Sequence, residues 1–295
     1  MTRPPDDEGF SPDWLALREP ADARARSGEL AARLADLLAS RPAGTGRRLV
    51  VHDLGCGTGS MGRWLAPTLP GPQHWVLHDR DPDLLARAAA TLPRAAADGS
   101  PVTAEARVGD LTRLDGADLA GAAVVTASAL LDLFTTADVD RLAAACATAR
   151  CPALLTLSVA GRVELTPAWP IDAAIDAAVG AAFDAAVGAA FDAHQRREAG
   201  ERRLLGPDAG PAAAAAFSAL GAAVEIRPTP WQLGPDDAAL TVEWLRGWLA
   251  AAAEQQPGLP PPDYRELRLA QAAAGRLAVV VHHVDLLVTW PAPTS

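Results

Sequence analysis

The sequence predicts an α/β fold, a doubly wound sheet with helices on both faces. Two patterns predict it: short apolar runs alternate with helix-like segments, and a glycine-rich turn joins the first run to a helix. Strands that alternate with helices form a parallel sheet covered on both faces. The chain has 295 residues, of which 49% are hydrophobic. This composition supports a large core and excludes general disorder.

The first element expected is a long helix over residues 15–40, which Pro42, Gly44 and Gly46 end. Further helices are expected at residues 61–69, 82–92 and up to residue 149. The expected strands are short apolar or alternating runs, at residues 49–54, 75–77, 102–108, 122–127, 153–159, 223–227 and 277–288. All of them fit one sheet.

Composition excludes several classes of function. With 26 basic and 36 acidic residues the formal net charge is −10, so no nucleic-acid partner is expected. The chain contains no lysine, which excludes lysine Schiff bases and a Walker phosphate loop.

Cysteine usage and the N-terminal residues indicate a cytoplasmic protein. Cys56, Cys146 and Cys151 are odd in number and lack metal-ligand spacing, so neither a metal site nor a disulfide framework is expected. Met1–Phe10 lacks the apolar core of a secretory signal. No run approaches the about 18 apolar residues that a membrane span needs, so no membrane partner is expected.

One segment is a direct repeat. Asp176–Phe183 reads DAAVGAAF, and Asp184–Phe191 repeats it without a change. Apolar residues four positions apart predict a helix with one apolar stripe, formed by Ile175, Val179, Phe183, Val187 and Phe191. Two interpretations stay open: a lid helix over a pocket, or a tandem duplication in a tolerant surface helix.

A glycine-rich turn carries the clearest functional signal. The first predicted strand leads into Asp53, and Gly55, Gly57 and Gly59 then alternate up to the start of a helix. Glycines let a ligand lie against bare backbone, near amides that donate hydrogen bonds. Asp79 follows the next apolar run, where an acid can bind two ribose hydroxyls. The pattern predicts a nucleotide-type site.

Two ligand classes fit this turn. Gly57, Gly59 and Gly62 also match the spacing of a dinucleotide fingerprint. An ionised Asp53 would repel a pyrophosphate but attract a cationic ligand without phosphates, such as S-adenosylmethionine. Asp53 therefore favours S-adenosylmethionine, and an NAD(P)-dependent oxidoreductase is the alternative.

From about residue 48 to residue 160 the chain resembles the class I S-adenosylmethionine-dependent methyltransferases. Asp53–Gly59, Val76–Asp79, Val108–Leu111 and Val124–Asp132 resemble the four motifs of that family, in order. The resemblance implies a Rossmann-like sheet of seven strands, the last antiparallel, with helical lid insertions. S-adenosylmethionine would be the cofactor and S-adenosylhomocysteine the product.

The motifs also imply roles for single residues. Asp53 would contact the amino group of the cofactor, Asp79 its ribose and Asp110 its adenine. Asp79 could instead cap the following helix, although Asp81 is better placed to do so. The cofactor-binding residues that the resemblance implies are Asp53, Gly55, Cys56, Gly57, Gly59, Asp79, Arg80, Asp110, Leu111 and Ser128.

Domain boundaries are expected where the motifs begin. Residues 1–44 would form an N-terminal helical segment and residues 45–295 the methyltransferase domain. Helical insertions are expected at about residues 165–205 and 230–275.

The methyl acceptor is expected to be a small molecule. Amino-group DNA methyltransferases carry an Asn/Asp/Ser-Pro-Pro-aromatic motif after the fourth strand, where this chain has Thr126–Ala129. The predicted catalytic residues are Ser128, Asp132 and His194. Ser128 and Asp132 could equally be a helix cap and a solvated acid. His194 begins an arginine-rich cluster that suits an anionic substrate group, or that simply ends a helix.

Three questions stay open at this point. The acceptor atom can be oxygen, nitrogen or carbon. A homodimer is compatible with the sequence. A non-catalytic protein that only binds the cofactor would show the same motifs.

Overall fold

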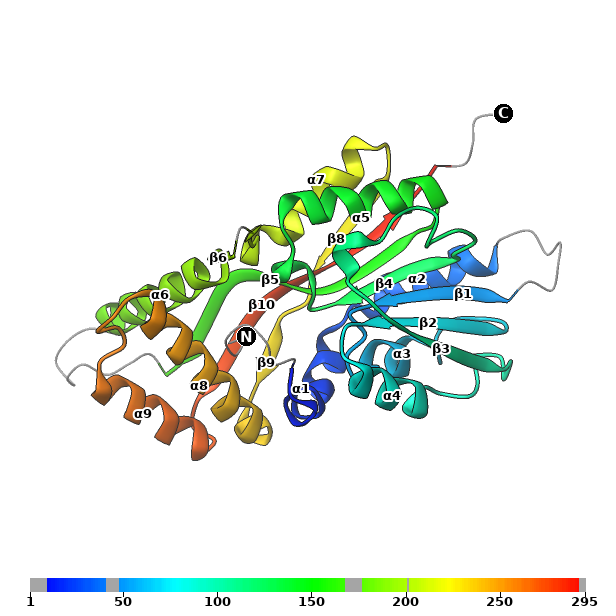
Figure 1. Cartoon of the computed structure of the whole chain (residues 1–295). Helices are drawn as coiled ribbons and strands as arrows, with labels where there is room; N and C mark the ends of the chain where they lie inside the picture. Colours follow the sequence, from blue (N-terminus) through cyan, green and yellow to red (C-terminus); the bar gives the residue numbers. More distant parts are fainter. Residues whose placement is uncertain (1–9, 41–47, 168–176, 201, 292–295) are drawn as a thin grey trace.

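The computed structural model describes residues 10–40, 48–167, 177–200 and 202–291. A twisted eight-stranded sheet runs through the molecule, with helices on both faces (Figure 1). The short strands β6 (Glu198–Ala199) and β7 (Arg202–Arg203) form a separate two-stranded sheet. The strands of the larger sheet lie in the order β3-β2-β1-β4-β5-β10-β8, and β9 adds to β10. Their bounds are β1 Leu49–Leu54, β2 Gln73–Asp79, β3 Val102–Val108, β4 Val124–Ser128, β5 Ala153–Thr166, β8 Ala223–Pro228, β9 Trp231–Leu233 and β10 Ala278–Thr289.

The direction of the strands confirms the predicted fold class. Strands β1 to β5 are parallel to one another, and β10 pairs antiparallel with both β5 and β8. The predicted seven-stranded sheet with an antiparallel last strand is present, and β9 is an addition that the sequence did not predict. Because β1 lies between β2 and β4, the strand order reverses beside it, which is where ligands bind in open α/β sheets.

Each face of the sheet has its own core. On one face α2, α3 and α4 pack around Leu30, Leu34 and Trp75, and on the other α5 and α7 pack around Leu142 and Phe217. These side chains are fully or almost fully buried. The helices are α2 Gly28–Ala39, α3 Ser60–Leu65, α4 Pro82–Thr91, α5 Thr136–Ala149 and α7 Ala209–Ala219.

The N-terminal helix differs from the prediction. Instead of one helix over residues 15–40, α1 (Pro12–Ala25) and α2 are separated at Arg26 and Ser27. The Ser27 hydroxyl accepts a hydrogen bond from the Leu30 amide at 3.2 Å, and the Ser27 amide donates to the buried Asp285 carboxylate at 2.8 Å. The cap and the anchor turn the chain there, because a capping serine starts a new helix.

The ends of β5 and β10 extend beyond the central sheet into a second lobe (Figure 1). There α6 (Ala177–Gln195), α8 (Ala238–Gln255) and α9 (Pro262–Ala273) surround a third core. Val187 and Phe191 of the repeat are buried in this core, whereas Ile175 of the predicted stripe lies outside the described residues. The second copy of the repeat is therefore a packed helix and not a freely exposed one.

A buried ion pair joins two helices of this lobe. Arg268 of α9 is 0% exposed and donates from Nη2 to both oxygens of Asp184, at 2.7 and 2.6 Å. Tyr264 also donates to Asp184, at 2.6 Å. Asp184, the first residue of the second repeat copy, thus fixes α6 against α9.

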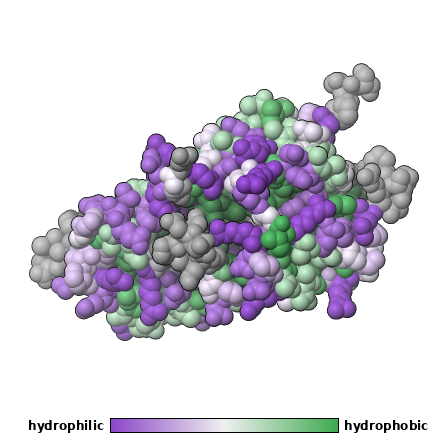
Figure 2. All heavy atoms as spheres, viewed as in Figure 1, coloured by the Kyte–Doolittle hydropathy of each residue, from purple (hydrophilic) through white to green (hydrophobic). Residues whose placement is uncertain are grey.

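The visible surface is mostly polar (Figure 2), and the cysteines lie inside the protein. Hydrophilic side chains dominate the face seen in Figure 2, and apolar ones are scattered in small groups. The three cysteines are buried, and none of them forms a disulfide in the described ranges. In the described ranges no helix is long and apolar enough to cross a bilayer.

Candidate cofactor and acceptor site

The glycine-rich turn after β1 needs glycine at three positions. Gly55, Gly57 and Gly59 have φ values of 62°, 53° and 90°, a left-handed region that side chains rarely adopt. A Cβ on Gly59 would lie 3.0 Å from the backbone of Ala88 in α4. The turn therefore packs tightly against its neighbour and leaves its other side bare.

Asp79, at the end of β2, faces this turn. Its Oδ2 accepts a hydrogen bond from the Gly57 amide at 2.9 Å and its Oδ1 accepts from the Asp81 amide at 3.1 Å. Asp81 itself caps α4, because its Oδ1 accepts from the amides of Asp83 and Leu84. The cap is thus Asp81, and the Asp79 carboxylate retains lone pairs for a ligand.

A cavity of about 490 Å³ lies above the carboxyl ends of β1, β2 and β4. Its volume is in the range of sites for small ligands. Gly59 does not line it, because this residue forms the start of α3 behind the turn. The other predicted cofactor-binding residues do line it: Asp53, Gly55, Cys56, Gly57, Asp79, Arg80, Asp110, Leu111 and Ser128.

Asp53 is almost completely buried, although it lines the cavity. Its side chain is 1% exposed, and Thr126 donates to Oδ1 at 2.7 Å. In the described part of the chain Oδ2 has no hydrogen-bond partner. Burial raises the pKa of Asp53 to about 7, against the opposing effects of Thr126 and the positive charge of Arg26. A cation placed beside it would favour the ionised form.

The pKa of Asp53 leads to an expected pH dependence. Below about pH 7 the free protein carries a protonated Asp53, and a cationic ligand that needs the ionised form must displace that proton. Affinity for S-adenosylhomocysteine, whose amino group is cationic, is therefore expected to rise with pH by up to about tenfold per unit and to level off above pH 7. Calorimetry from pH 5.5 to 8.5 would measure this. Asp53→Asn should give a flat profile, and an equally steep profile in that variant would contradict the assignment.

Arg26, which the sequence did not single out, lies behind the cavity. Its side chain is buried, and Nη2 donates to the hydroxyls of Ser60 at 2.9 Å and Ser128 at 3.0 Å. The guanidinium also lies 5.6 Å from the centroid of the Trp64 ring. Burial lowers the pKa of Arg26. Ser128 is therefore positioned by an arginine, and its own hydroxyl proton remains available to a ligand.

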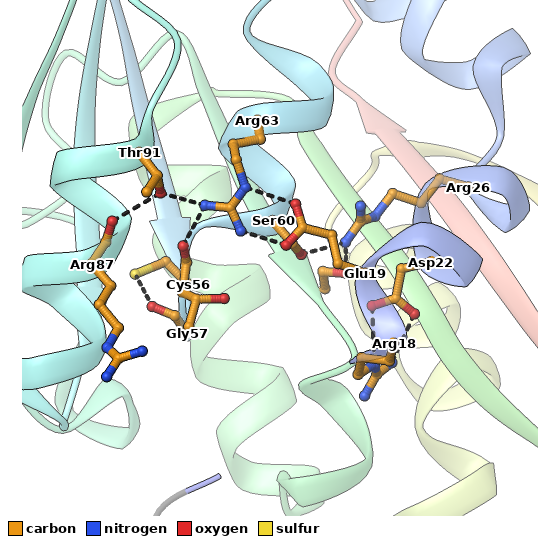
Figure 3. Close-up of polar contacts among 12 residues, drawn as sticks. Arg18, Glu19, Asp22, Arg26, Cys56, Gly57, Ser60, Arg63, Arg87 and Thr91 are labelled. Carbon is orange, nitrogen blue, oxygen red and sulfur yellow. Dashed lines mark hydrogen bonds and ion pairs between the residues drawn. The ribbon is translucent and has the colours of Figure 1, made fainter. Parts of the chain in front are cut away.

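Helix α1 covers the cavity. Leu15, Arg18 and Asp22 of this helix line it. Figure 3 shows how Arg63 of α3 fastens α1 at this point: the guanidinium donates to Glu19 at 2.7 and 2.5 Å, and also to the Thr58 carbonyl and the Thr91 hydroxyl. One side chain thus joins the helix that covers the cavity to the glycine-rich turn.

This contact predicts an effect on ligand release. Glu19→Gln keeps the size of the side chain but removes the ion pair with Arg63, which is about a quarter exposed. We expect S-adenosylhomocysteine to dissociate faster, by up to about fivefold, because a partly exposed pair contributes about 1 kcal/mol at most. Stopped-flow tryptophan fluorescence measures the rate. Glu243→Gln, which removes an exposed pair within α8, is the matched control, and an equal effect there would contradict the role of α1.

Residues 51–152 match a family model described as a methyltransferase domain. This segment contains most of β1, all of β2 to β4, the glycine-rich turn and Asp79. This segment, about a third of the chain, is similar to methyltransferase domains. The strands around it form the Rossmann-like α/β sheet that the sequence predicted.

Similar solved structures have low identity to this chain. A cyclopropane synthase from Mycobacterium tuberculosis is 14% identical, with 95% of each chain covered and a TM-score of 0.45. The magnesium protoporphyrin IX methyltransferase of Synechocystis PCC 6803, solved with bound S-adenosylhomocysteine, is 12% identical, covers 96% of this chain and 90% of its own, and has a TM-score of 0.43. No curated protein matches the sequence. These values are too low to transfer a substrate.

The predicted catalytic residues do not all lie near the cavity of the methyltransferase domain. Ser128 lines it. Asp132 is 6% exposed and lines a smaller cavity beside it. His194 lies between α6 and α8, with Nδ1 3.7 Å from Glu254 Oε2, and lines neither cavity. The structure therefore brings Ser128 and Asp132 to the site but not His194.

The arginine cluster after His194 does not converge on one ligand either. Arg196 pairs with Asp208 at 2.6 Å. Arg202 lines the larger cavity and donates to Asp138 at 2.7 Å. These arginines are therefore close together in the sequence, but they do not line one shared pocket.

Proposed function

We propose that this protein transfers a methyl group from S-adenosylmethionine to a small-molecule acceptor. The observation that carries the proposal is the cavity between the glycine-rich turn and three carboxylates, those of Asp53, Asp79 and Asp110. Three acids suit a cationic nucleoside without phosphates and oppose a pyrophosphate. The family-model match to residues 51–152 supports the same conclusion.

The residues of the cavity fit the parts of this cofactor. Asp79, fixed by two backbone amides, would accept from the ribose hydroxyls. Asp110 has one carboxylate oxygen bound to Thr112, which leaves the other for the adenine amino group. Oδ2 of Asp53 has no hydrogen-bond partner among the described residues, and the ammonium group of the cofactor would supply both a donor and a balancing charge there.

When bound, S-adenosylmethionine supplies an activated methyl group on a sulfonium. The protein has to hold the acceptor in line with that methyl group and exclude water. The backbone of Gly55 and Gly57 would help to hold the reactants in place. Helix α1, which covers the cavity, would exclude water. Ser128 would hold one side of the reacting centre, since Arg26 fixes its hydroxyl. His194 has no part in the proposal.

Calorimetry with S-adenosylhomocysteine and with NADH tests the cofactor. We expect the first to bind and the second not to, and Asp53→Ala to lose affinity for the first. Labelled-methyl transfer to a metabolite extract then tests the reaction. Uptake of NADH, strengthened by Asp53→Ala, would show an oxidoreductase instead. Binding of S-adenosylhomocysteine without transfer to any extract would favour a non-catalytic binding protein.

A further inference from the structure

The smaller cavity beside the proposed cofactor site has aromatic walls. Its volume is about 40 Å³, and Arg18 and Ala129 line both cavities. One water needs about 10 to 15 Å³ of such space, so the cavity admits the end of a molecule and not a whole one. The aromatic side chains come from α1, α6, β9 and α8, and they are Trp14, Phe191, Trp231 and Trp244.

Two buried polar side chains face this apolar space. His283 of β10 is 4% exposed, lines the cavity, and among the described residues has no hydrogen-bond partner for Nδ1. Asp132 also lines it; its carboxyl group accepts a hydrogen bond from its own backbone amide, and burial raises its pKa. A buried polar atom without a partner, such as Nδ1 of His283, is costly in a protein interior. A ligand that supplies the partner would remove this cost.

The charges around the cavity limit the ligand to a neutral group. Arg18 lies over the rings of Trp14 and Trp231, at 5.9 and 5.0 Å from their centroids, and is bound to Asp22. The Arg18 guanidinium therefore already occupies the faces of these two rings, and its positive charge disfavours an ammonium ligand there. The Asp132 carboxyl group opposes an anionic one.

We propose that the smaller cavity is the acceptor subsite, that it takes a neutral phenolic hydroxyl, and that Asp132 receives the hydroxyl proton. This inference rests on the proposed function. A phenol suits the aromatic walls, and its O–H is more acidic than that of an aliphatic alcohol, which makes a carboxylate a sufficient base.

The step balances without any further reactant. A lone pair of the phenolic oxygen forms the new bond to the methyl carbon, and the electron pair of the broken carbon–sulfur bond stays on sulfur. The phenolic proton moves to an oxygen of Asp132 and later leaves to water. The products are an aryl methyl ether and S-adenosylhomocysteine. Nδ1 of His283 forms a hydrogen bond with the phenolic hydroxyl group, and His283 therefore acts as a positioning residue.

The test uses the full chain and 4-methylphenol as the probe, with cyclohexanol, benzoate and benzylamine as comparison compounds. Ligand-observed NMR on protein saturated with S-adenosylhomocysteine measures binding, and labelled-methyl transfer measures turnover. We expect 4-methylphenol to bind at least about tenfold more tightly than the other three and to yield 4-methylanisole. A preference for benzylamine or benzoate would overturn the neutral class.

Two variants separate the binding and proton-transfer roles. Asp132→Asn is expected to keep affinity for S-adenosylhomocysteine and 4-methylphenol but to lose about 100-fold or more in turnover, together with the acidic limb of the pH profile. Val159→Trp, which fills the cavity, should abolish 4-methylphenol binding alone. Asp208→Asn, an exposed carboxylate paired with Arg196, is the matched control.

The outcomes also separate this inference from the proposed function. Failure of the wild-type protein to bind S-adenosylhomocysteine overturns both. If the cofactor product binds but Asp132→Asn turns over the phenol at the wild-type rate, the proton-acceptor role is wrong and the proposed function stands. Unchanged 4-methylphenol binding in Val159→Trp would place the acceptor elsewhere.

Discussion

Asp79→Ala is expected to weaken binding of S-adenosylhomocysteine by about 100-fold or more. The carboxylate would accept from two ribose hydroxyls, and hydrogen bonds to a charged group contribute about 1.5 to 3 kcal/mol each. The substitution also removes the acceptor of the Gly57 amide, which holds the turn in place. Isothermal titration calorimetry measures the affinity directly.

Two further variants make this prediction specific. Asp79→Asn keeps an oxygen for the Gly57 amide, so we expect a smaller loss than with alanine. Asp83→Ala, an exposed acid on the first turn of α4, should leave the affinity unchanged. A loss in Asp83→Ala as large as in Asp79→Ala would mean that net charge, and not ribose contact, determines binding.

Arg268→Met is expected to lower the free energy of unfolding by about 3 to 5 kcal/mol, because it leaves the carboxylate of Asp184 buried without its cation. Asp184 then retains only the Tyr264 hydroxyl among the donors that the structure describes for it. Urea denaturation followed by circular dichroism measures the change. The lobe of α6, α8 and α9 should loosen first.

A double variant tests the cause of that loss. Asp184→Asn combined with Arg268→Met removes both charges, and we expect it to be more stable than Arg268→Met alone. Affinity for S-adenosylhomocysteine should survive in both, because Arg268 lies in the second lobe and does not line the larger cavity. If the double variant is the less stable one, the ion pair is not the source of the effect.

Local sequence was sufficient to predict the seven long strands of the main sheet and the cofactor-side turn, but not the short strands β6, β7 and β9. Asp53, the alternating glycines and Asp79 lie within about one βαβ unit, where strand ends and glycine positions follow from the pattern of nearby residues. The same locality predicted Asp81 as the better helix cap. The cavity-lining positions Asp110 and Leu111 came from the resemblance, and their roles toward a ligand stay predictions.

Contacts between distant residues could not be predicted in this way. Arg26 meets Ser128 across 102 positions, and Trp231 meets Asp22 across 209. The residues adjacent in sequence to Arg26 and Trp231 do not indicate these distant partners. The break between α1 and α2 did have a signal that was missed: Ser27 followed three residues later by Leu30 is the spacing of a capping serine before an apolar run. His194 shows the opposite case: neighbours in the sequence suggested a site, whereas the structure places His194 beside Glu254 and away from both cavities, and its catalytic role stays a prediction.

Helix α1 borders both cavities, because Leu15 and Asp22 face the larger one while Trp14 faces the smaller and Arg18 faces both. An acceptor bound against Trp14 and Arg18 would keep α1 closed over the larger cavity and over the donor bound there. Donor exchange would then have to wait until the second molecule departs. Such an enzyme follows compulsory-order kinetics, with the donor entering first and the spent thioether leaving last, so that the latter inhibits competitively with the donor alone.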